Sequence, residues 1–269
     1  MDKASRKKLG LFKGYQRLRE QEQSDPLPLT FTTILSANRP VRALLTSRRA
    51  NLPAYFEAGE IVTFGVTSHA IRSARGDARP PFKILDGDAV GEKRLRAFYN
   101  EVSPRRTLFP VLPNPLPAGL KWSDFVVLEK DGKIVASAAM WNQQSIRQIR
   151  VASYHPLLSF IRPVINPLLK MLGYFPLPPA PSEMDCLYVA YRLTRHESPA
   201  EFESLLAAIS SRIANRILFF ALHEHDPLLP TALRLTAWHY RSMLYTVSFA
   251  PEPIPITFKH PPYIELAML

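Results

Sequence analysis

A run of four polar residues, His223-Glu224-His225-Asp226, contains side chain types that bind metal ions. It follows an apolar stretch predicted to be a strand, where His223 and His225 would share one face. No third ligand is spaced to complete a zinc site with them. Asp226 is explained instead as the cap of a helix that starts with Pro227. We therefore expect no metal site.

The cysteine content and the N-terminus both bear on the compartment. Cys186 is the single cysteine, so no intramolecular disulfide can form, as in proteins of a reducing cytoplasm. The start of the chain, MDKASRKKLGLFKGYQRLREQ, is basic and lacks the apolar core of a secretory signal. We expect a cytoplasmic protein with a buried, structural thiol at Cys186.

Composition and charge exclude several classes of protein. Of the 269 residues, 46% are apolar and 21% charged, which excludes a disordered chain, collagen and a coiled coil. The net charge of +11 is uneven, because residues 1–83 hold 15 Lys/Arg against 7 Asp/Glu. A basic segment of this kind can meet phosphate in a nucleic acid or in a nucleotide-like cofactor, and it can equally be a solvated surface.

The most apolar stretch is residues 156–178, PLLSFIRPVINPLLKMLGYFPLP. Arg162, Asn166, Lys170 and two internal prolines interrupt it, so it does not supply the roughly 20 apolar residues of a membrane span. Two alternatives stay open for residues 157–173, a helix on a membrane surface and a half-buried amphipathic helix. The second is favoured.

Hydrophobic periodicity predicts the elements that would position any site. In the first part of the chain we expect helix 9–23, strand 29–35, helix 37–52, strand 61–66 and a polar linker that begins at residue 72. The second part shows a hairpin signal, Asp131-Gly132 between two alternating runs. The remaining expected elements are helix 89–102, hairpin strands 125–129 and 133–140, strand 148–154, strand 185–193, helix 198–215, strand 217–222, a short helix after Asp226, and strands 238–249 and 262–269.

This order predicts an α/β (α+β) fold, a mixed central sheet flanked by helices. It resembles the Gcn5-related N-acetyltransferase (GNAT) family. The string FVVLEKDGKIVASAAMWNQQ is similar to the second and third strands of that family. CLYVAYRL followed by SPAEFESLLAAISSRIAN is similar to its fourth strand and central helix, and ILFFALHEHDPLLPTALR to its fifth strand and the next helix. The resemblance covers about residues 86–269.

Residues 6–68 resemble the back half of another copy of the same fold. RKKLGLFKGYQRLRE is similar to the phosphate loop and central helix, and LTFTTILSANRPVRALL to the fifth strand and following helix. The resemblance therefore implies a tandem protein with a truncated first copy. Its expected divisions are a partial unit at residues 1–71, a linker at 72–85 and a GNAT-like domain at 86–269.

In this family, acetyl-coenzyme A enters between the splayed fourth and fifth strands, and a glycine-rich turn holds its pyrophosphate on backbone N–H groups. The second copy has Arg-Leu-Thr-Arg-His-Glu-Ser-Pro at residues 192–199, without glycine, and Glu197 would repel phosphate there. The first copy keeps more of the pattern, although Leu45 stands where the family has a tyrosine proton donor. The resemblance thus implies these cofactor-binding residues: Lys7, Lys8, Gly10, Gly14 and Asn38.

Acyl transfer to an amine also needs a route for protons, which a general acid and base can supply. No motif fixes one, so the catalytic residue is not assigned. The candidates are Glu129, Glu183, Asp185, His239, Tyr240 and Tyr245.

The resemblance implies an acyl-CoA-dependent N-acyltransferase, with acetyl-CoA or a longer acyl-CoA as co-substrate and an unknown amine as acceptor. A catalytically inactive binding or scaffold protein on the same fold is the alternative, favoured by the missing glycine turn. Binding of nucleic acid or an anionic membrane through residues 3–49 is disfavoured, because aromatic residues do not alternate with the basic ones. An exposed sheet edge in the first copy would allow a homodimer.

Overall fold

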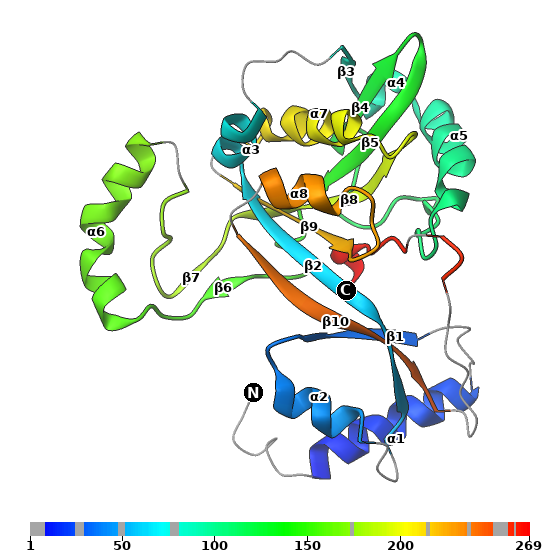
Figure 1. The fold of residues 1–269 in the computed structure, drawn as a ribbon, viewed down its shortest axis with the longest axis vertical. Coiled ribbons are helices and arrows are strands. Elements are labelled where there is room, and N and C mark those ends of the chain that lie inside the picture. Colours follow the sequence, from blue (N-terminus) through cyan, green and yellow to red (C-terminus); the bar gives the residue numbers. More distant parts are fainter. Residues whose placement is uncertain are drawn as a thin grey trace. The chain divides into compact units, whose positions relative to one another are not determined.

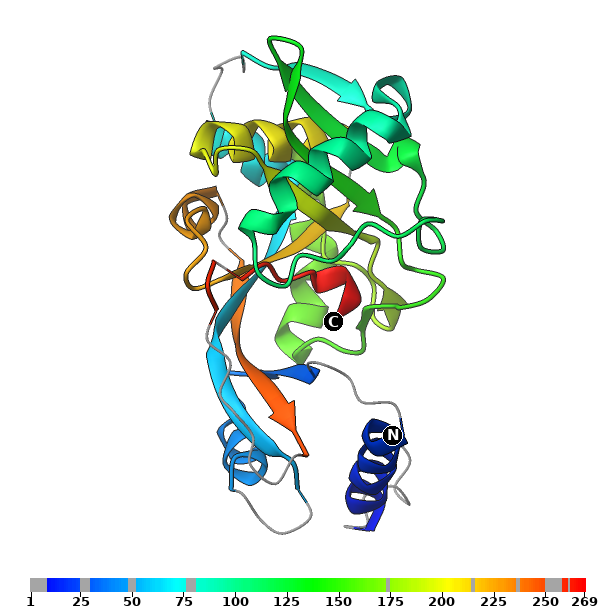
Figure 2. The ribbon, with the colours of Figure 1, turned by 90° about the vertical axis from the view of Figure 1, so that its right-hand side faces the viewer.

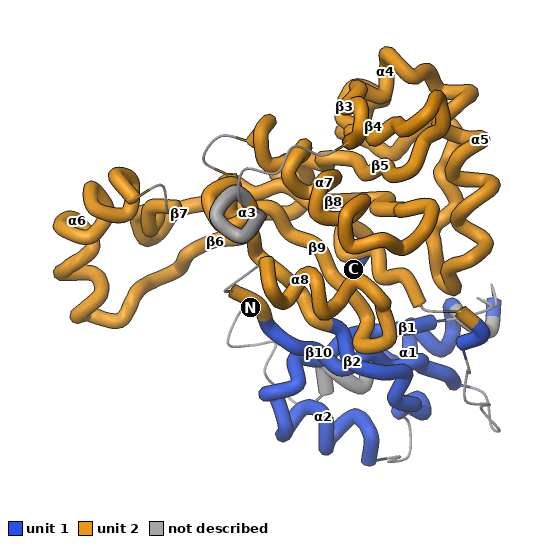
Figure 3. The backbone as a smooth tube through the Cα atoms, turned by 45° about the horizontal axis from the view of Figure 1, so that its top comes forward, with its two compact units in different colours: residues 1–61, 240–259, 269 blue, residues 62–239, 260–268 orange. Residues whose placement is uncertain are grey.

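The structure is a computed structural model in which residues 9–24, 30–47, 52–75, 81–172, 175–213, 216–235, 238–249, 258–260 and 262–269 are described. The chain divides into two compact units (Figure 3). Unit 1 consists of Met1–Ile61, Tyr240–Lys259 and Leu269, and unit 2 of Val62–His239 and His260–Met268. Strand β2 (Ala54–Thr67) runs from the first unit into the second.

The strands form a mixed eight-stranded sheet in the order β1-β10-β2-β9-β8-β5-β4-β3 (Figure 1). The pair β8/β9 is parallel, whereas β1/β10, β3/β4, β4/β5 and β5/β8 are antiparallel. The bounds, besides β2, are β1 (Thr30–Leu35), β3 (Lys83–Asp86), β4 (Phe125–Lys130), β5 (Lys133–Trp141), β8 (Cys186–Thr194), β9 (Ile217–His223) and β10 (His239–Ser248). The expected mixed sheet flanked by helices is confirmed.

The helices are distributed between both units. Unit 1 holds α1 (Leu9–Ser24) and α2 (Arg39–Leu45). Unit 2 holds α3 (Ser68–Arg75), α4 (Gly87–Val90), α5 (Glu92–Val102), α6 (Pro156–Met171), α7 (Pro199–Ser210), α8 (Leu229–Leu235) and the 3-10 turns η2 (Ser103–Arg105), η3 (Trp122–Asp124) and η4 (Leu266–Met268). Among the described residues, none of these helices is long and apolar enough to cross a membrane.

Two helices cover opposite faces of the sheet in unit 2 (Figure 1 and Figure 2). Helix α7 buries Phe202 in a cluster that includes Val126 of β4. Because side chains alternate along a strand, the neighbouring Phe125 points to the other face, where its ring meets Tyr99 of α5. The sheet therefore has a packed core on both sides.

Unit 1 joins its elements through polar contacts as well as strand pairing. Strand β1 pairs with β10, with Thr32 opposite Tyr245. The Arg42 guanidinium of α2 donates to the Tyr245 hydroxyl at 3.0 Å and pairs with Glu57 of β2 at 3.0 Å. The Tyr15 and Tyr55 hydroxyls lie 2.7 Å apart and so connect α1 to β2.

The local turn and helix signals are mostly confirmed. Asp131 and Gly132 both have positive φ, 51° and 75°, in the turn between β4 and β5, which is the conformation that an Asp-Gly hairpin turn requires. The helix expected over residues 89–102 is present as α4 and α5, separated at Gly91, where φ is 84°.

Three expectations differ from the structure. Residues 148–154 form only the short β6 (Arg150–Val151), which pairs with β7 (Ser182–Glu183) outside the main sheet. Residues 262–269 form no strand; buried side chains occur at every position from Tyr263 to Ala267, so the period of two misled the prediction. Within the segment expected as a linker, residues 72–75 end α3 and residues 83–85 belong to β3.

Candidate functional site

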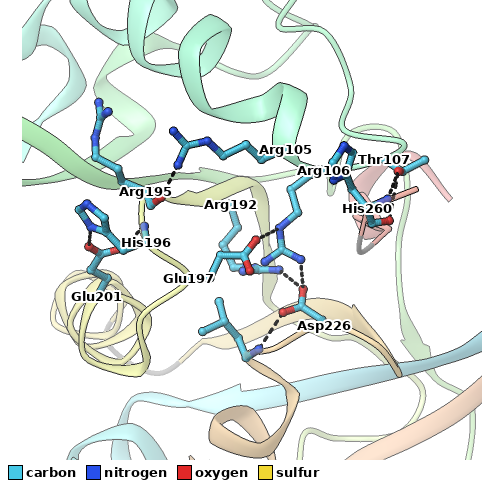
Figure 4. Close-up of polar contacts among 11 residues, drawn as sticks. Arg105, Arg106, Thr107, Arg192, Arg195, His196, Glu197, Glu201, Asp226 and His260 are labelled. Atoms are coloured by element: carbon cyan, nitrogen blue, oxygen red, sulfur yellow. Dashed lines mark hydrogen bonds and ion pairs between the residues drawn. The ribbon is translucent and has the colours of Figure 1, made fainter. Parts of the chain in front are cut away.

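A cleft of about 460 Å³ opens at the turn between β8 and α7. That volume lies in the range of small-molecule sites, roughly 300–1,000 Å³. Its lining residues are Val102, Arg105, Arg106, Leu193, Thr194, Arg195, His196, Glu197 and His260. The cleft thus gathers three arginines and two histidines against one carboxylate (Figure 4).

A cluster of four charges, three of them buried, adjoins the cleft, and two of its members, Arg106 and Glu197, line it. The Asp226 carboxylate receives Arg106 at 3.3 Å and Arg192 at 3.1 Å, and the Arg106 Nε lies 2.9 Å from Glu197. Burial lowers the pKa of Arg106, and the nearby Arg192 adds to this, whereas Asp226 and Glu197 oppose it. The four formal charges sum to zero. The cluster therefore holds the turn between β8 and α7 in place and adds no net charge to the cleft.

Glu197 lies in the turn that corresponds to the glycine-rich phosphate turn of the family and that has no glycine here. Its φ is +52°, a left-handed conformation that costs a non-glycine residue about 1–2 kcal/mol. The ion pair with Arg106 holds it there. The expected repulsion of phosphate by Glu197 is therefore weakened, because its carboxylate is already neutralised by a buried guanidinium.

Glu201 satisfies the backbone at the start of α7. Ser198 is the N-cap residue, but its side chain makes no capping bond. The buried Glu201 carboxylate instead reaches back to His196, accepting its backbone N–H at 3.1 Å and contacting its ring Nδ1. An anion that used this N–H group would have to displace Glu201, so the side chains of the cleft are the better anion ligands.

Arg105 is the lining arginine that no described carboxylate neutralises, whereas Arg195 is paired. The Arg105 guanidinium donates to the backbone oxygen of Arg195 at 3.2 Å. Arg195 itself donates to the Ile134 carbonyl at 2.9 Å and pairs with Glu101, whose pKa that hydrogen bond lowers. The Thr194 side chain is buried, and its Oγ1 has no hydrogen-bond partner among the described residues.

A β-bulge lies in β8 just before this turn. Ser137 of β5 pairs with Leu193 and Ala139 with Ala190, so Tyr191 and Arg192 together oppose one residue. Tyr191 has φ +51°, and the Tyr99 hydroxyl donates to its carbonyl at 2.9 Å. The bulge turns the N–H groups of Tyr191 and Arg192 away from the ladder.

Both bulge N–H groups bind the C-terminal segment. Tyr191 donates to Glu265 Oε2 at 2.6 Å, and Arg192 donates to the Tyr263 hydroxyl at 2.9 Å. The Tyr263 hydroxyl in turn donates to Glu265 Oε2 at 2.9 Å, and Ala267 N–H reaches Oε1 at 3.2 Å. Burial raises the pKa of Glu265 to about 7, although these donors and Arg192 act in the opposite direction.

Strands β8 and β9 pair over three positions, Cys186↔Ile217 to Tyr188↔Phe219, although both strands continue further. The turn η4 contacts both β8 and β9. The C-terminal segment therefore packs against the two strands at which acyl-CoA was expected to enter.

Among the residues predicted from the first copy, Gly10, Gly14 and Asn38 belong to unit 1. Lys7 and Lys8 fall outside the described residues. Gly10 and Gly14 lie inside α1, which begins at Leu9, and a Cβ added at Gly14 would meet no atom within 4 Å. Asn38 is the N-cap residue of α2 without a side-chain capping bond. Their role in cofactor binding stays a prediction.

The proton-transfer candidates do not converge on the cleft, since none of them is among its lining residues. Glu129, Glu183 and Asp185 pair with arginines on the surface. Tyr245 is buried between Arg42 and Glu57. No group of three metal-ligating side chains occurs within the described ranges, and Asp226 accepts the Leu228 N–H at 2.9 Å ahead of α8, as a capping residue does.

Sequence reasoning missed Arg105, Arg106 and Glu265. The two arginines stand in a segment for which no element was expected, directly after helix 89–102. Their adjacency was the available signal. No sequence signal marked Glu265, because a carboxylate in an alternating run near the end of the chain is typical of a solvent-exposed position.

No family model and no curated protein matches this chain. Among solved structures, a GCN5-related N-acetyltransferase from Sphaerobacter thermophilus is similar at a TM-score of 0.51 and 10% identity, covering 93% of this chain and 71% of that one. A second, from Anabaena variabilis, has a TM-score of 0.41 and 9% identity and covers 90% of this chain and 51% of that one. The chain has the fold of the GCN5-related N-acetyltransferases.

Proposed function

We propose that this protein is an acyl-CoA-dependent N-acyltransferase that holds the phosphates of acetyl-CoA or a longer acyl-CoA in the cleft between β8 and α7. The observation that carries the proposal is the set of cationic side chains converging on one cleft at the turn before α7. Guanidinium groups bind phosphate oxygens in pairs with matching geometry. Arg105 would therefore take over the role of the absent glycines.

The detailed lining of the cleft supports this assignment. Glu197 and Arg106 neutralise each other, and the His196 ring contacts Glu201, so Arg105 and His260 are the lining side chains available to an anion. The buried Thr194 hydroxyl, without a partner among the described residues, offers one further hydrogen bond at the same place. A ligand oxygen would satisfy it.

In the proposed reaction, the amine nitrogen of the acceptor bonds to the thioester carbonyl carbon and the carbon–sulfur bond breaks. The proton lost by the amine ends on the sulfur of coenzyme A. The chain's contribution would be to bind and orient the acyl-CoA, which lowers the entropic part of the barrier. The first-copy residues Lys7, Lys8, Gly10, Gly14 and Asn38 remain the cofactor-binding residues that the family resemblance predicts.

A catalytically inactive binding or scaffold protein is the second candidate, and one observation favours it. Glu265 and Tyr263 already take the two N–H groups that the bulge at Tyr191 frees. Backbone N–H donors in such places can stabilise a developing oxyanion, but only when no carboxylate occupies them. Catalysis would thus require the C-terminal segment to move.

Calorimetry and a thiol-release assay on the full chain distinguish the two candidates. Acetyl-CoA and palmitoyl-CoA are titrated into the protein, and free coenzyme A is then followed with and without a panel of primary amines. Binding with amine-dependent thiol release supports the acyltransferase. Binding without thiol release for any amine supports the inactive protein. No heat of binding from a folded chain contradicts the acyl-CoA proposal altogether.

A further inference from the structure

Helix α6 belongs to an excursion between β5 and β8, residues 142–185, which we call the arm. The arm also contains β6 and β7, and α6 lies away from the other helices of unit 2 (Figure 1 and Figure 3). None of the residues of α6 is fully buried. It contributes no residue to the cleft.

One side of α6 is an exposed apolar row, which we call the α6 stripe. Its members follow one another at intervals of three or four residues, which places them on one face of a helix. The stripe consists of Leu157 (65% exposed), Phe160 (84%), Val164 (78%), Leu168 (50%) and Met171 (77%). A monomeric soluble protein rarely leaves so continuous an apolar surface uncovered.

The other side of α6 is fixed to the arm itself. Asn166 exchanges two hydrogen bonds of 2.9 Å with the backbone of Leu177, and Arg162 donates to the same carbonyl. Leu158 and Ile161 are half-buried on this side. The expected half-buried amphipathic helix is therefore confirmed for one face, and the α6 stripe is the additional feature that this expectation did not predict.

The charge of the arm has one sign over most of its length. No Asp or Glu occurs in residues 132–182, whereas Arg147, Arg150, Arg162 and Lys170 fall in that range. The two acidic residues at the base of the arm are already paired, Glu183 with Arg150 and Asp185 with Arg216. The arm therefore has a net charge of +2, and Lys170 is the basic side chain of α6 that is exposed.

We propose that α6 lies in the headgroup region of a bilayer containing anionic lipids, with the α6 stripe buried at the acyl boundary. Apolar side chains on one face and basic ones beside them are the features of helices that lie in this interface. The helix is about 24 Å long, at 1.5 Å per residue. The α6 stripe contains no polar side chain that could hold the helix at one position in a groove of another protein. A second copy of this chain fits less well, since two arms of equal positive charge would repel each other. The inference does not depend on the proposed acyl transfer.

Flotation of the full-length protein with vesicles tests the proposal. Vesicles of phosphatidylcholine alone are compared with vesicles containing 30% phosphatidylglycerol. We expect at least tenfold tighter binding to the anionic vesicles, since each basic side chain at the surface contributes about fivefold. Lys170→Gln should weaken this binding by about fivefold.

The double variant Phe160→Ser/Val164→Ser removes the centre of the α6 stripe, and it should lose at least about tenfold in vesicle binding. Val111→Ser is the matched control, because Val111 is 88% exposed in unit 2 but lies outside the arm. Both variants should unfold at the wild-type temperature, since the substituted side chains are mostly exposed.

Three results would overturn the proposal. The first is that the folded wild type does not float with anionic vesicles. The second is that the double variant binds these vesicles as tightly as Val111→Ser does. In the third, the wild type is a dimer that ignores vesicles and that the double variant converts to a monomer, so the α6 stripe would be an interface between copies.

Discussion

The buried carboxylate of Glu265 should make the stability of this protein fall as the pH rises through neutrality. Glu265 is 7% exposed, and burial raises its pKa to about 7 from an ordinary value of 4.5. Because the folded state holds the proton more tightly, the stabilisation is complete below pH 4.5 and is lost as the pH rises through 7. At about 1.4 kcal/mol for each pH unit between these values, the loss amounts to about 3 kcal/mol.

Glu265→Gln removes the titrating group and keeps the shape. Glutamine cannot accept from all of Tyr191, Tyr263 and Ala267, so at pH 5 the variant should be less stable than the wild type by about 1 kcal/mol. By pH 8 the variant should be more stable than the wild type, because only the wild type then has an ionised carboxylate buried at this position.

Urea unfolding at pH 5, 6, 7 and 8 measures the difference in the free energy of unfolding between the two proteins. Glu203→Gln on the surface of α7 is the control, and its difference from the wild type should stay constant. Glu101 does not interfere, since the hydrogen bond from Arg195 lowers its pKa and its effect therefore lies at more acidic pH. Parallel profiles for the wild type and Glu265→Gln would refute the burial of Glu265 against the bulge.

Two further predictions concern the turn behind the cleft and two glycines. Arg106→Met should reduce the free energy of unfolding by about 3 kcal/mol, because it removes a buried partner from both Glu197 and Asp226. Chemical denaturation measures this loss, and Arg234→Met is the exposed control. An equal loss in both variants would contradict the buried cluster. Gly132→Ala should lower the free energy of unfolding by about 1 kcal/mol, because alanine is strained at a φ of 75°. Gly14→Ala should raise it by about 0.5–1 kcal/mol, because alanine favours helix α1 and meets no atom there. Equal changes in the two variants would argue against the hairpin turn.

The sequence predicted the fold well wherever local signals agreed with packing. The Asp131-Gly132 turn and the helix that begins at Pro199 are examples, because turn geometry and the preference of proline for the first helical turn act within a few residues. It failed at residues 148–154 and 262–269, where alternating residues do not join the main sheet. Strand pairing is a long-range property, so periodicity alone cannot decide whether a partner strand is present.

The candidate site was harder to predict than the fold. The turn at residues 192–199 was singled out from the sequence, and its lack of glycine was interpreted as evidence against phosphate binding there. That inference overlooked Arg105 and Arg106, which come from a segment almost 90 residues earlier and meet the turn only after folding. The neutralisation of Glu197 and the burial of Glu265 likewise depend on partners far away in the sequence.

The most direct test of the proposed acyl-CoA site is the dissociation constant of coenzyme A, measured by calorimetry at pH 7 for the wild type, Arg105→Gln and Arg234→Gln. Arg105 lines the cleft, and Arg234 is an arginine of α8 outside it. Loss of one charge-assisted hydrogen bond to phosphate should weaken binding by about tenfold or more in Arg105→Gln and leave Arg234→Gln at the wild-type value. Equal affinity for all three proteins would contradict the placement of the phosphates in this cleft.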